Sequence, residues 1–397
     1  MSWPYLLKTT PFHERTARLC ASHAWRRWAG YLVASSYGLT HEREYHAIRA
    51  CAALLDVSPL YKYLVRGRHA ARLLDRVVTR EVARLELGQV LYTPWCDAAG
   101  KVLDDGTIAR LEESTFRMTA AEPNLRWLED NALGLELAIE DVSESTAALA
   151  LQGPASHAIL RQLGDAELRY FRLRATTLGG IPVTLSRTGY TGDLGFEIWV
   201  QRENALELWD ALIAAGRPYG ITPAGMLALD LARIEAGLML IDVDYVPARK
   251  AMIEAQTSSP FELDLGWAVS LGKEQFVGRA ALAAEAQRGP RWRFVGLELE
   301  WQALERLYAE VGLAPRLPST AWRASVPVYA GADQVGYATS GGWSPLLKKY
   351  LALAHLRSPW AAPGTPVEME ITVEHRRQRA AARVVEKPFF DPERKKA

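Results

Sequence analysis

QVLYTPW (89–95), AAGK (98–101) and VLDDGTIARL (102–111) follow one another as two alternating runs joined at a glycine. This pattern predicts two β-strands paired as a hairpin. A further short strand is expected from Phe116 to Thr119, and PNLRWLEDNA (123–132) predicts a helix with proline in its first turn. The sequence around the hairpin therefore indicates strands that are neighbours both in the chain and in a sheet.

The region before this hairpin adds a strand between two helices. EREYHAIRACAALL (42–55) has the spacing of an amphipathic helix, YKYLVRG (61–67) alternates as a strand does, and RHAARLLDRVVTR (68–80) is again helical. The order strand, helix, three strands, helix favours an antiparallel α+β fold over a doubly wound parallel sheet.

A second set of elements follows. Its predicted strands are 147–151, 181–187 and 196–200, and its predicted helices are 154–163, 203–216 and 223–237. Residues 254–262 predict a loop. Past about residue 285, short alternating runs such as RFVGLEL and VEMEITV predict a separate, smaller β domain. We therefore expect one α+β region of two subdomains over 1–275 and a β domain over 285–397.

Composition and charge exclude several classes of protein. The 397 residues are 49% hydrophobic and 23% charged, which is typical of a globular chain and not of a disordered one. With 47 Lys and Arg against 46 Asp and Glu, the net charge of +1 gives no bulk field for nucleic acid or an anionic membrane. The 13 tryptophans suit a protein that holds a flat ligand.

The sequence also indicates where the protein resides. The start, MSWPYLLKTTPF, lacks the basic and apolar regions of a signal peptide, and no run of 18 apolar residues predicts a membrane span. The cysteines, Cys20, Cys51 and Cys96, form no close pair, so neither a disulfide framework nor a zinc cluster is expected. A reducing cytoplasm fits this cysteine usage.

Familiar catalytic and metal-binding motifs are missing from the sequence. HEREYH (41–46) places its histidines five residues apart, about 140° apart on a helix, and so does not match a zinc-binding pair. Ser344 lies in GWSPL, which lacks the second glycine of a nucleophile elbow. The chain has no GxGxxG, no GxxxxGK[ST] and no CxxC, so we expect no bound metal, no dinucleotide site and no P-loop.

Two segments carry acidic residues that suit a ligand site. Asp104 and Asp105 are adjacent in a predicted strand, so they point to opposite faces, and either both are solvated or one enters a pocket. In SRTGYTGDLGFEIWV (186–200), three glycines allow sharp turns and close approach of the backbone to a ligand. Glu197 of this segment is either an exposed strand residue or an acceptor for two adjacent N–H donors of a pterin-like ring, with Tyr190 as a flat wall.

A third segment, ALDLARIEAGLMLIDVDYVPARK (228–250), combines acids with a tyrosine. Arg233 and Glu235 are two residues apart and do not share a helix face. Asp242 and Asp244 alternate in what we expect to be an extended run, with Tyr245 on the other side. The two aspartates either bind a cation or are exposed loop acids.

The sequence resembles the aminomethyltransferase family, the glycine cleavage system T-protein and its relatives, from about residue 10 to 390. The matching motifs, in order, are DVSPLYKYLVRG (56–67), GQVLYT (88–93), GKVLDDGTIARL (100–111), LALQGP (149–154), GYTGDLGFEIW (189–199), RIEAGL (233–238), GWAV (266–269), FVGRAAL (276–282), VGLEL (295–299), YATSGGWSP (337–345) and KPFF (387–390). Each motif is weak alone, whereas their common order and spacing are specific.

The resemblance implies a fold, a cosubstrate and site residues. It implies a multi-domain ring of α+β units around a central channel, with a C-terminal β-barrel, and tetrahydrofolate bound in that channel. Asp104 matches the family's channel aspartate and is implied to be catalytic. Glu197 matches its pterin-binding glutamate, with Tyr190 nearby. Trp267 and Arg233 match further residues on the folate side.

Departures from the family's pattern cluster where the one-carbon donor is expected. Its FDVSHM is LDVSPL here, and its ARD becomes ALD, so that Leu229 replaces a folate-contacting arginine. A lipoyl-bound aminomethyl donor is therefore not expected. The positions of Tyr31, Tyr61 and Tyr245 resemble the substrate-side tyrosines of folate-dependent aryl O-demethylases. On this resemblance Tyr31 and Tyr245 are catalytic, and the donor side includes Tyr61, Asp244 and Trp343.

These observations predict a tetrahydrofolate-dependent one-carbon transferase. It moves a methyl or methylene group from a small donor, with a methylated or aminomethyl amine favoured because acids attract a cation. O-demethylation of a methoxy-aromatic compound is the first alternative, since tyrosines and tryptophans form flat apolar walls. A non-catalytic folate-binding or sensing module is the second. The sequence does not fix the oligomeric state.

Overall fold

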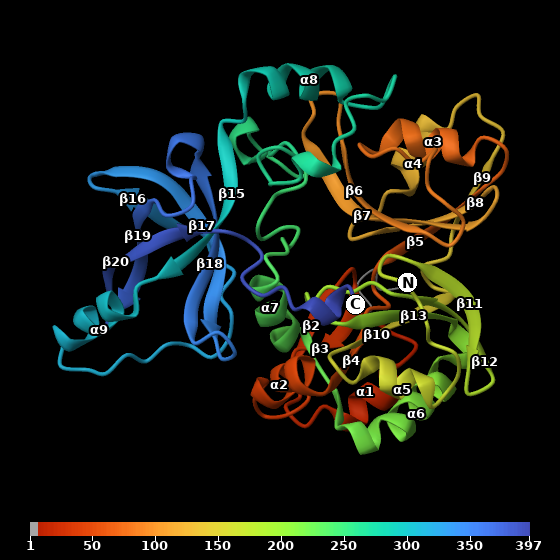
Figure 1. The fold of residues 1–397 in the computed structure, drawn as a ribbon, viewed down its shortest axis with the longest axis horizontal. Coiled ribbons are helices and arrows are strands. Elements are labelled where there is room, and N and C mark those ends of the chain that lie inside the picture. The colour runs from red at the N-terminus through yellow and green to blue at the C-terminus, as the bar shows by residue number, and fades with distance from the viewer. Residues whose placement is uncertain (1–6) are drawn as a thin grey trace, which may run out of the picture. The chain divides into compact units, whose positions relative to one another are not determined.

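The computed structural model describes residues 7–397, which form strands and helices (Figure 1). The chain divides into two compact units. The first unit contains the chain up to Thr93, Asp104–Leu229 and Pro392–Ala397, and the second contains Pro94–Leu103 and Asp230–Asp391. Residues 1–6, on which the expected absence of a signal peptide partly rests, lie outside the described residues. The division into 1–275 and 285–397 stays a prediction.

The predicted hairpin belongs to a five-stranded sheet that lies mostly in the first unit, whereas the turn of the hairpin, Pro94–Leu103, is assigned to the second unit. Its strands are ordered β6 (Val90–Cys96), β7 (Val102–Glu112), β8 (Thr115–Ala120), β5 (Tyr61–Arg66) and β9 (Ala138–Asp141). Helices α3 (Ala70–Val77) and α4 (Leu125–Asn131) cover one face of this sheet (Figure 1). The side chains buried on that face come from alternate positions, namely Tyr63, Val65, Ile108, Phe116 and Met118.

The second sheet of the first unit has six strands. Their order is β11 (Leu173–Leu178), β12 (Ile181–Ser186), β13 (Gly195–Gln201), β10 (Thr146–Gln152), β4 (Ala52–Asp56) and β14 (Ile221–Pro223). All pairs are antiparallel except β14 with β4. The core on one face includes Leu149, Ile198, Leu208 and Trp209, with α5 (Ser156–Arg161) and α6 (Ala205–Gly216) packed there. The predicted antiparallel α+β class is confirmed for this unit.

The helix predicted over 42–55 is too long. Helix α2 (Glu42–Ala50) ends before Cys51, and the apolar residues after it form β4. Ala52, Ala53, Leu54 and Leu55 are almost completely buried in the middle of the sheet, and a short apolar run of this kind suits a buried strand as well as a helix.

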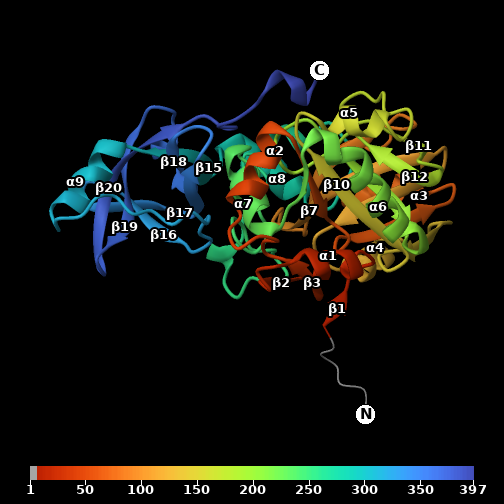
Figure 2. The same cartoon turned by 90° about the horizontal axis from the view of Figure 1, so that it is seen from below.

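The N-terminal elements were not predicted. Strands β1 (Lys8–Thr9), β3 (Tyr31–Ala34) and β2 (Trp25–Trp28) form a small sheet, and helix α1 (His13–Leu19) lies beside β3 (Figure 2). The sequence WRRW of β2 does not alternate between apolar and polar residues, so the period-two signal of a strand is absent there.

The second unit contains a closed barrel. Its strands are ordered β15 (Trp292–Leu299), β18 (Lys349–Arg357), β17 (Asp333–Ser344), β16 (Val326–Ala330), β19 (Pro366–Val373) and β20 (Arg376–Val385). Helix α9 (Trp301–Ala309) packs against β20, and α8 (Arg279–Arg288) precedes the barrel. The predicted C-terminal β-barrel is confirmed. Helix α7 (Met226–Glu235) spans the boundary between the units.

Three further features concern residues 7–397 only. No helix there is both long and apolar enough to cross a membrane. No group of three or more His, Cys, Asp or Glu side chains there is arranged to hold a metal ion. The three cysteines are free, as their spacing predicts. The ring around a central channel stays a prediction.

Candidate functional site

The two large sheets of the first unit meet through polar side chains. Arg117 of β8 points away from the side that α3 and α4 cover, because side chains alternate along a strand. Its guanidinium carbon lies 4.0 Å from the centroid of the Trp199 ring, on β13 of the other sheet. Glu197 lies two residues before Trp199 and so on the same face of β13. We call Lys62, Arg117, Glu197 and Trp199 the inter-sheet layer.

Glu197 is a half-buried carboxylate with little of its acceptor capacity used. The Thr188 hydroxyl donates a hydrogen bond of 2.6 Å to Oε2, and no other residue in 7–397 donates to this carboxylate. Burial raises the pKa of Glu197, against the lowering effects of the Thr188 hydroxyl and the Arg117 charge. A carboxylate has about four acceptor positions, so Glu197 has room for two further donors.

Two of the three glycines before Glu197 allow the close approach of another side chain of the protein. A Cβ atom on Gly189 or Gly195 would lie 2.1 to 2.6 Å from atoms of the Gln152 side chain. The Gln152 amide donates to the carbonyl oxygens of Thr188 and Phe196, and its oxygen accepts from the Thr191 hydroxyl. These two glycines therefore make room for a side chain that fixes the loop, and the close approach of a ligand to this loop stays a prediction.

Two buried cations belong to the inter-sheet layer. Burial lowers the pKa of Arg117 to about 10, with the Glu197 charge acting in the opposite direction, so the guanidinium is charged at neutral pH. Burial also lowers the pKa of Lys62 to about 7, against the opposing charge of Asp56. The Lys62 ammonium donates to the carbonyl oxygens of Ser58 and Ser143, at 2.7 and 3.2 Å. Neither cation was predicted from the sequence. A Lys in YKYLVR and an Arg in TFRMTA, each between apolar strand residues, could have indicated buried charges.

Asp104 is completely buried near one end of β7. It accepts hydrogen bonds from the backbone N–H of Asp105 (2.8 Å), the backbone N–H of Glu122 (3.0 Å) and the side-chain amide of Asn124 (2.8 Å). Burial and then the Asp105 charge raise the pKa of Asp104 to about 8, while the three donors act to lower it. Asp104 therefore titrates near neutral pH.

Asp105 has other partners and lies on the other face of β7. The Tyr92 hydroxyl donates to it at 2.8 Å. Burial and Asp105 raise the pKa of Tyr92 well above its usual value, with a smaller contribution from Tyr190. Tyr190 therefore lies near the Tyr92–Asp105 pair. Strand alternation puts Asp105, and not Asp104, on the same face as Arg117. The catalytic role of Asp104 stays a prediction.

Tyr31 and Tyr61 are neighbours in the first unit. Burial raises the pKa of Tyr31, with smaller contributions from Glu144 and Tyr61, while Lys8 acts to lower it. The Lys8 ammonium lies 5.7 Å from the centroid of the Tyr31 ring, and Tyr61 stacks on Tyr63. The third tyrosine, Tyr245, is buried in the second unit. The roles predicted for these tyrosines stay predictions.

The run 241–245 is a turn and not the extended segment that we expected. Asp242 has a φ of 63°, and its N–H donates to the carbonyl of Tyr245. The Asp242 carboxylate pairs with Lys250 at 2.7 Å, whereas Asp244 is buried. The two aspartates have different partners, so they do not form the shared cation site that alternation would have produced.

Asp244 and Arg233 bind each other inside the second unit. Arg233 donates to Asp244 at 2.5 Å, and both side chains are completely buried. The same carboxylate accepts from the Leu240 N–H (2.8 Å) and from the hydroxyls of Thr339 (2.5 Å) and Ser340 (2.7 Å). Four donors fill its acceptor positions. The folate role of Arg233 and the donor role of Asp244 stay predictions.

The two tryptophans predicted for the site also lie in the second unit. Trp267 is 64% exposed, in a short 3₁₀ turn (Gly266–Ala268). Trp343 lies on β17 of the barrel, and its ring centroid is 5.1 Å from that of Trp301 on α9. Their binding roles stay predictions.

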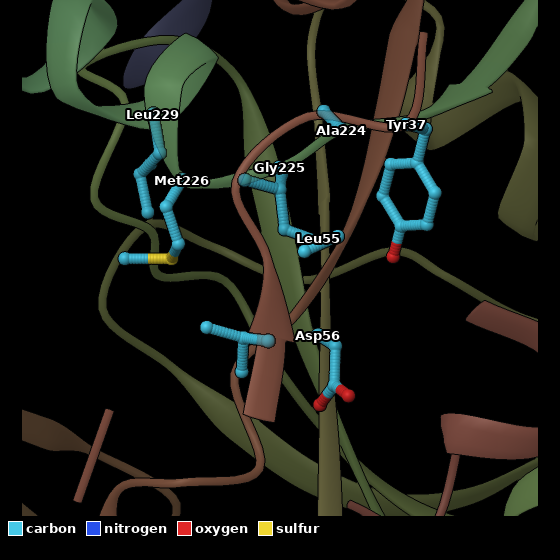
Figure 3. Close-up of a pocket in the computed structure, with 9 residues that line it drawn as sticks. Tyr37, Leu55, Asp56, Ala224, Gly225, Met226 and Leu229 are labelled. Atoms are coloured by element: carbon cyan, nitrogen blue, oxygen red, sulfur yellow. The ribbon is translucent and has the colours of Figure 1, made fainter. Parts of the chain in front are cut away.

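A small pocket in the first unit was not predicted (Figure 3). Leu55, Met226 and Leu229 supply apolar walls, and Tyr37 and Asp56 supply the polar groups. Asp56 is half-buried, and desolvation of its carboxyl raises its pKa. The pocket contains Leu229, the position at which the sequence departs from the arginine of the resembling family.

Comparisons with known proteins agree with this architecture. The family described as "GCVT N-terminal domain" matches residues 10–273, and the "Glycine cleavage T-protein C-terminal barrel domain" matches residues 310–391. The aminomethyltransferase of Geobacillus thermodenitrificans is 34% identical over 97% of this chain and 99% of its own length. That of Halothermothrix orenii is 32% identical over 97% of this chain and 100% of its own length.

A solved structure shows the same fold. The glycine cleavage system aminomethyltransferase T from Bartonella henselae superposes with a TM-score of 0.82 at 28% identity, covering 97% of this chain and 99% of that one. The match spans both family regions, the α+β part and the barrel. The chain belongs to the glycine cleavage T-protein (aminomethyltransferase) family of enzymes.

Proposed function

We propose that the protein is a tetrahydrofolate-dependent transferase that moves a methyl or methylene group from a small donor to the folate. The observation that carries this proposal is Glu197, a half-buried carboxylate with one protein donor and the charge of Arg117 nearby. Relatives named aminomethyltransferase support the reaction class.

The chemistry of the inter-sheet layer fits a reduced pterin. The ring presents an amino group and an adjacent ring N–H, which a single carboxylate accepts together. Glu197 has acceptor positions for both, and Arg117, stacked on the Trp199 ring, is the charged group beside it. The Nε atom of Arg117 is buried and has no hydrogen-bond partner among residues 7–397, which indicates a layer whose polar groups are not all satisfied by that part of the chain.

Each residue then has a defined task. Glu197 holds and orients the pterin edge, and Tyr190 limits its position. Asp104 stabilises positive charge near the reacting atoms when it is ionised, and its pKa of about 8 allows it to exchange a proton near neutral pH. Tetrahydrofolate, when bound, supplies the nitrogen that accepts the one-carbon unit.

An amine is the favoured donor because the relatives act as aminomethyltransferases and Asp104 is present in the matching motif. Asp242 and Asp244 no longer support this choice, since each is paired with a cation of the protein. A methoxy-aromatic donor remains the second candidate, because Tyr31 and Tyr61 are neighbours and Tyr31 keeps its proton at neutral pH.

The test is to incubate the protein with tetrahydrofolate and a panel of methylated amines and methoxy-aromatic compounds. Mass spectrometry then follows 5-methyl- and 5,10-methylene-tetrahydrofolate. Product from an amine, absent with Glu197→Gln, supports the proposal, and product only from a methoxy-aromatic compound supports the second candidate. Tight folate binding without product from any donor would identify a sensing module instead.

A further inference from the structure

Arg117 is a buried cation that the protein itself does not satisfy. Its side chain is 6% exposed, and its Nε is buried with no hydrogen-bond partner. Within residues 7–397 it interacts with the Trp199 ring at 4.0 Å, with the charge of Glu197 and, unfavourably, with the charge of Lys62. Buried charges in proteins are usually paired and hydrogen-bonded, because desolvation of an ion is costly. A guanidinium left in this state therefore suits a ligand atom that accepts hydrogen bonds.

The neighbouring groups limit what that ligand atom can be. Glu197 and Trp199 are on the same face of β13, and Arg117 stacks on Trp199, so the guanidinium and the carboxylate lie along one edge of the layer. The two groups do not form a hydrogen-bonded pair. The layer thus presents two acceptor oxygens and, beside them, a charged donor. A ring edge that complements it must offer two donors followed by an acceptor.

The oxo edge of a pterin has this pattern: an amino group, a ring N–H and a carbonyl oxygen in sequence. We infer that Arg117 recognises the carbonyl oxygen of the bound pterin and thereby selects 2-amino-4-oxo rings over 2,4-diamino rings. This assignment rests on the proposed function, since it places the pterin edge on Glu197. A diamino ring puts an N–H donor where the carbonyl was, next to a buried cation, and its neighbouring ring nitrogen carries no hydrogen for Glu197 to accept. A site built for one hydrogen-bond pattern rejects the other strongly, so both Arg117 and Glu197 contribute to the selection.

A second source of acceptor oxygens is the glutamate tail of a folate, and the experiment separates the two. Isothermal titration under anaerobic conditions uses three probes: 6-methyl-tetrahydropterin, which has the oxo edge and no tail, its 2,4-diamino counterpart, and tetrahydrofolate. The proteins are the wild type, Arg117→Met, Arg117→Lys and Arg66→Met. Arg66 is a matched control, because it lies on the same sheet but is exposed and paired with Glu140.

The wild type and Arg66→Met are expected to bind the oxo ring at least about tenfold more tightly than the diamino ring. Arg117→Met loses at least about tenfold in affinity for both oxo ligands, and its preference over the diamino ring falls by a similar factor, with the remaining preference coming from Glu197. Arg117→Lys keeps part of the preference, because it retains a charge and a donor but not the planar stacking group. Arg117→Lys also provides the measurement if Arg117→Met does not fold, which circular dichroism shows.

Other outcomes overturn the assignment in distinguishable ways. If Arg117→Met weakens tetrahydrofolate but not the tail-less pterin, Arg117 binds the glutamate tail. If neither Arg117 variant changes affinity or selectivity, the residue does not contact the ligand, while the proposed function stands. If the wild type binds none of the three probes, the proposed function fails and the assignment fails with it.

Discussion

The side-chain amide of Asn124 donates a hydrogen bond of 2.8 Å to Asp104 and joins the start of α4 to the middle of the predicted site. Asn124 is itself completely buried, and its backbone N–H donates to the Tyr63 hydroxyl at 2.8 Å. The amide thus has a fixed position from which it stabilises the ionised form of Asp104. Replacement of Asn124 is therefore expected to change the pKa of Asp104 without altering the carboxylate itself.

Replacement of Asn124 by Ala is expected to move the pH profile of turnover upward. The wild type should lose turnover as the pH falls below about 8, because the Asp104 pKa is about 8 and the ionised form is the active one. Without the Asn124 donor the pKa rises further, and so does the midpoint of the profile. Asn131→Ala is the control, because Asn131 is on the same helix and its side-chain amide donates to the Trp127 carbonyl and not to Asp104.

The same pKa determines how stability depends on pH. The pKa of Asp104 is raised in the folded protein from 3.8, so its contribution to stability is full below about pH 4 and is lost as the pH rises to 8. Chemical denaturation at several pH values should show this loss in the wild type and not in Asp104→Asn. An unchanged pH profile in Asn124→Ala would show that Asp104 does not control turnover.

Asp104→Asn and Asp105→Asn distinguish the two neighbouring carboxylates. We expect Asp104→Asn to keep folate binding within a few fold and to lose most turnover, with Asp105→Asn milder. Three N–H groups donate to the Asp104 carboxylate. In Asp104→Asn the side-chain NH₂ group faces at least one of these donors, which should lower the free energy of unfolding by about 1–3 kcal/mol. Steady-state kinetics and calorimetry measure both effects. If Asp105→Asn loses turnover instead, the face shared with Arg117 carries the chemistry.

Asp244→Asn is expected to destabilise the protein, because it leaves the buried Arg233 without its carboxylate partner. Loss of one partner from a buried pair costs about 3–5 kcal/mol, whereas Asp242→Asn breaks only the more exposed pair with Lys250 and should cost about 0–1 kcal/mol. Urea denaturation measures the difference. A stable Asp244→Asn variant with a raised KM would instead support a role in donor binding.

Arg394→Gln tests how the C-terminal residues hold the glycine-containing loop. Arg394 donates to both oxygens of Asp193, at 2.7 and 2.9 Å, and Asp193 is completely buried in that loop. Loss of this contact should lower stability by about 1–3 kcal/mol and weaken folate binding, because Glu197 follows the loop directly. Arg126→Gln, an exposed helix pair, is the control and should change neither. Equal effects in both variants would contradict this role.

Much of the fold was predictable because its signals are local. The hairpin around Gly100, strands β5, β8, β10 and β13, and the helices α3 to α7 all follow the apolar period of the sequence. The boundary at Cys51 was not predictable, since AALL (52–55) is apolar throughout and only its place in the sheet makes it a strand. Asp242 was expected in an extended run, but it has a positive φ in a turn closed by the hydrogen bond from its N–H to the Tyr245 carbonyl.

The candidate site was predictable only in part. Resemblance identified Asp104 and Glu197, whereas composition and spacing left both open. Arg117 lies in no recognised motif. It is a candidate ligand-binding residue because it is buried between two sheets whose strands are distant in sequence. Gly189 and Gly195 signalled a close approach correctly, but the group that approaches is Gln152, which lies on another strand.

Calorimetric titration of tetrahydrofolate into the wild type, Glu197→Gln and Glu140→Gln tests the pterin site most directly. Glu197→Gln keeps the size of the side chain but replaces one acceptor oxygen by a donor, and a charged hydrogen bond contributes about 1.5–3 kcal/mol. We predict at least about a tenfold loss of affinity for Glu197→Gln, with wild-type affinity for Glu140→Gln, whose carboxylate is exposed beside Arg66. Unchanged affinity in Glu197→Gln would contradict the account.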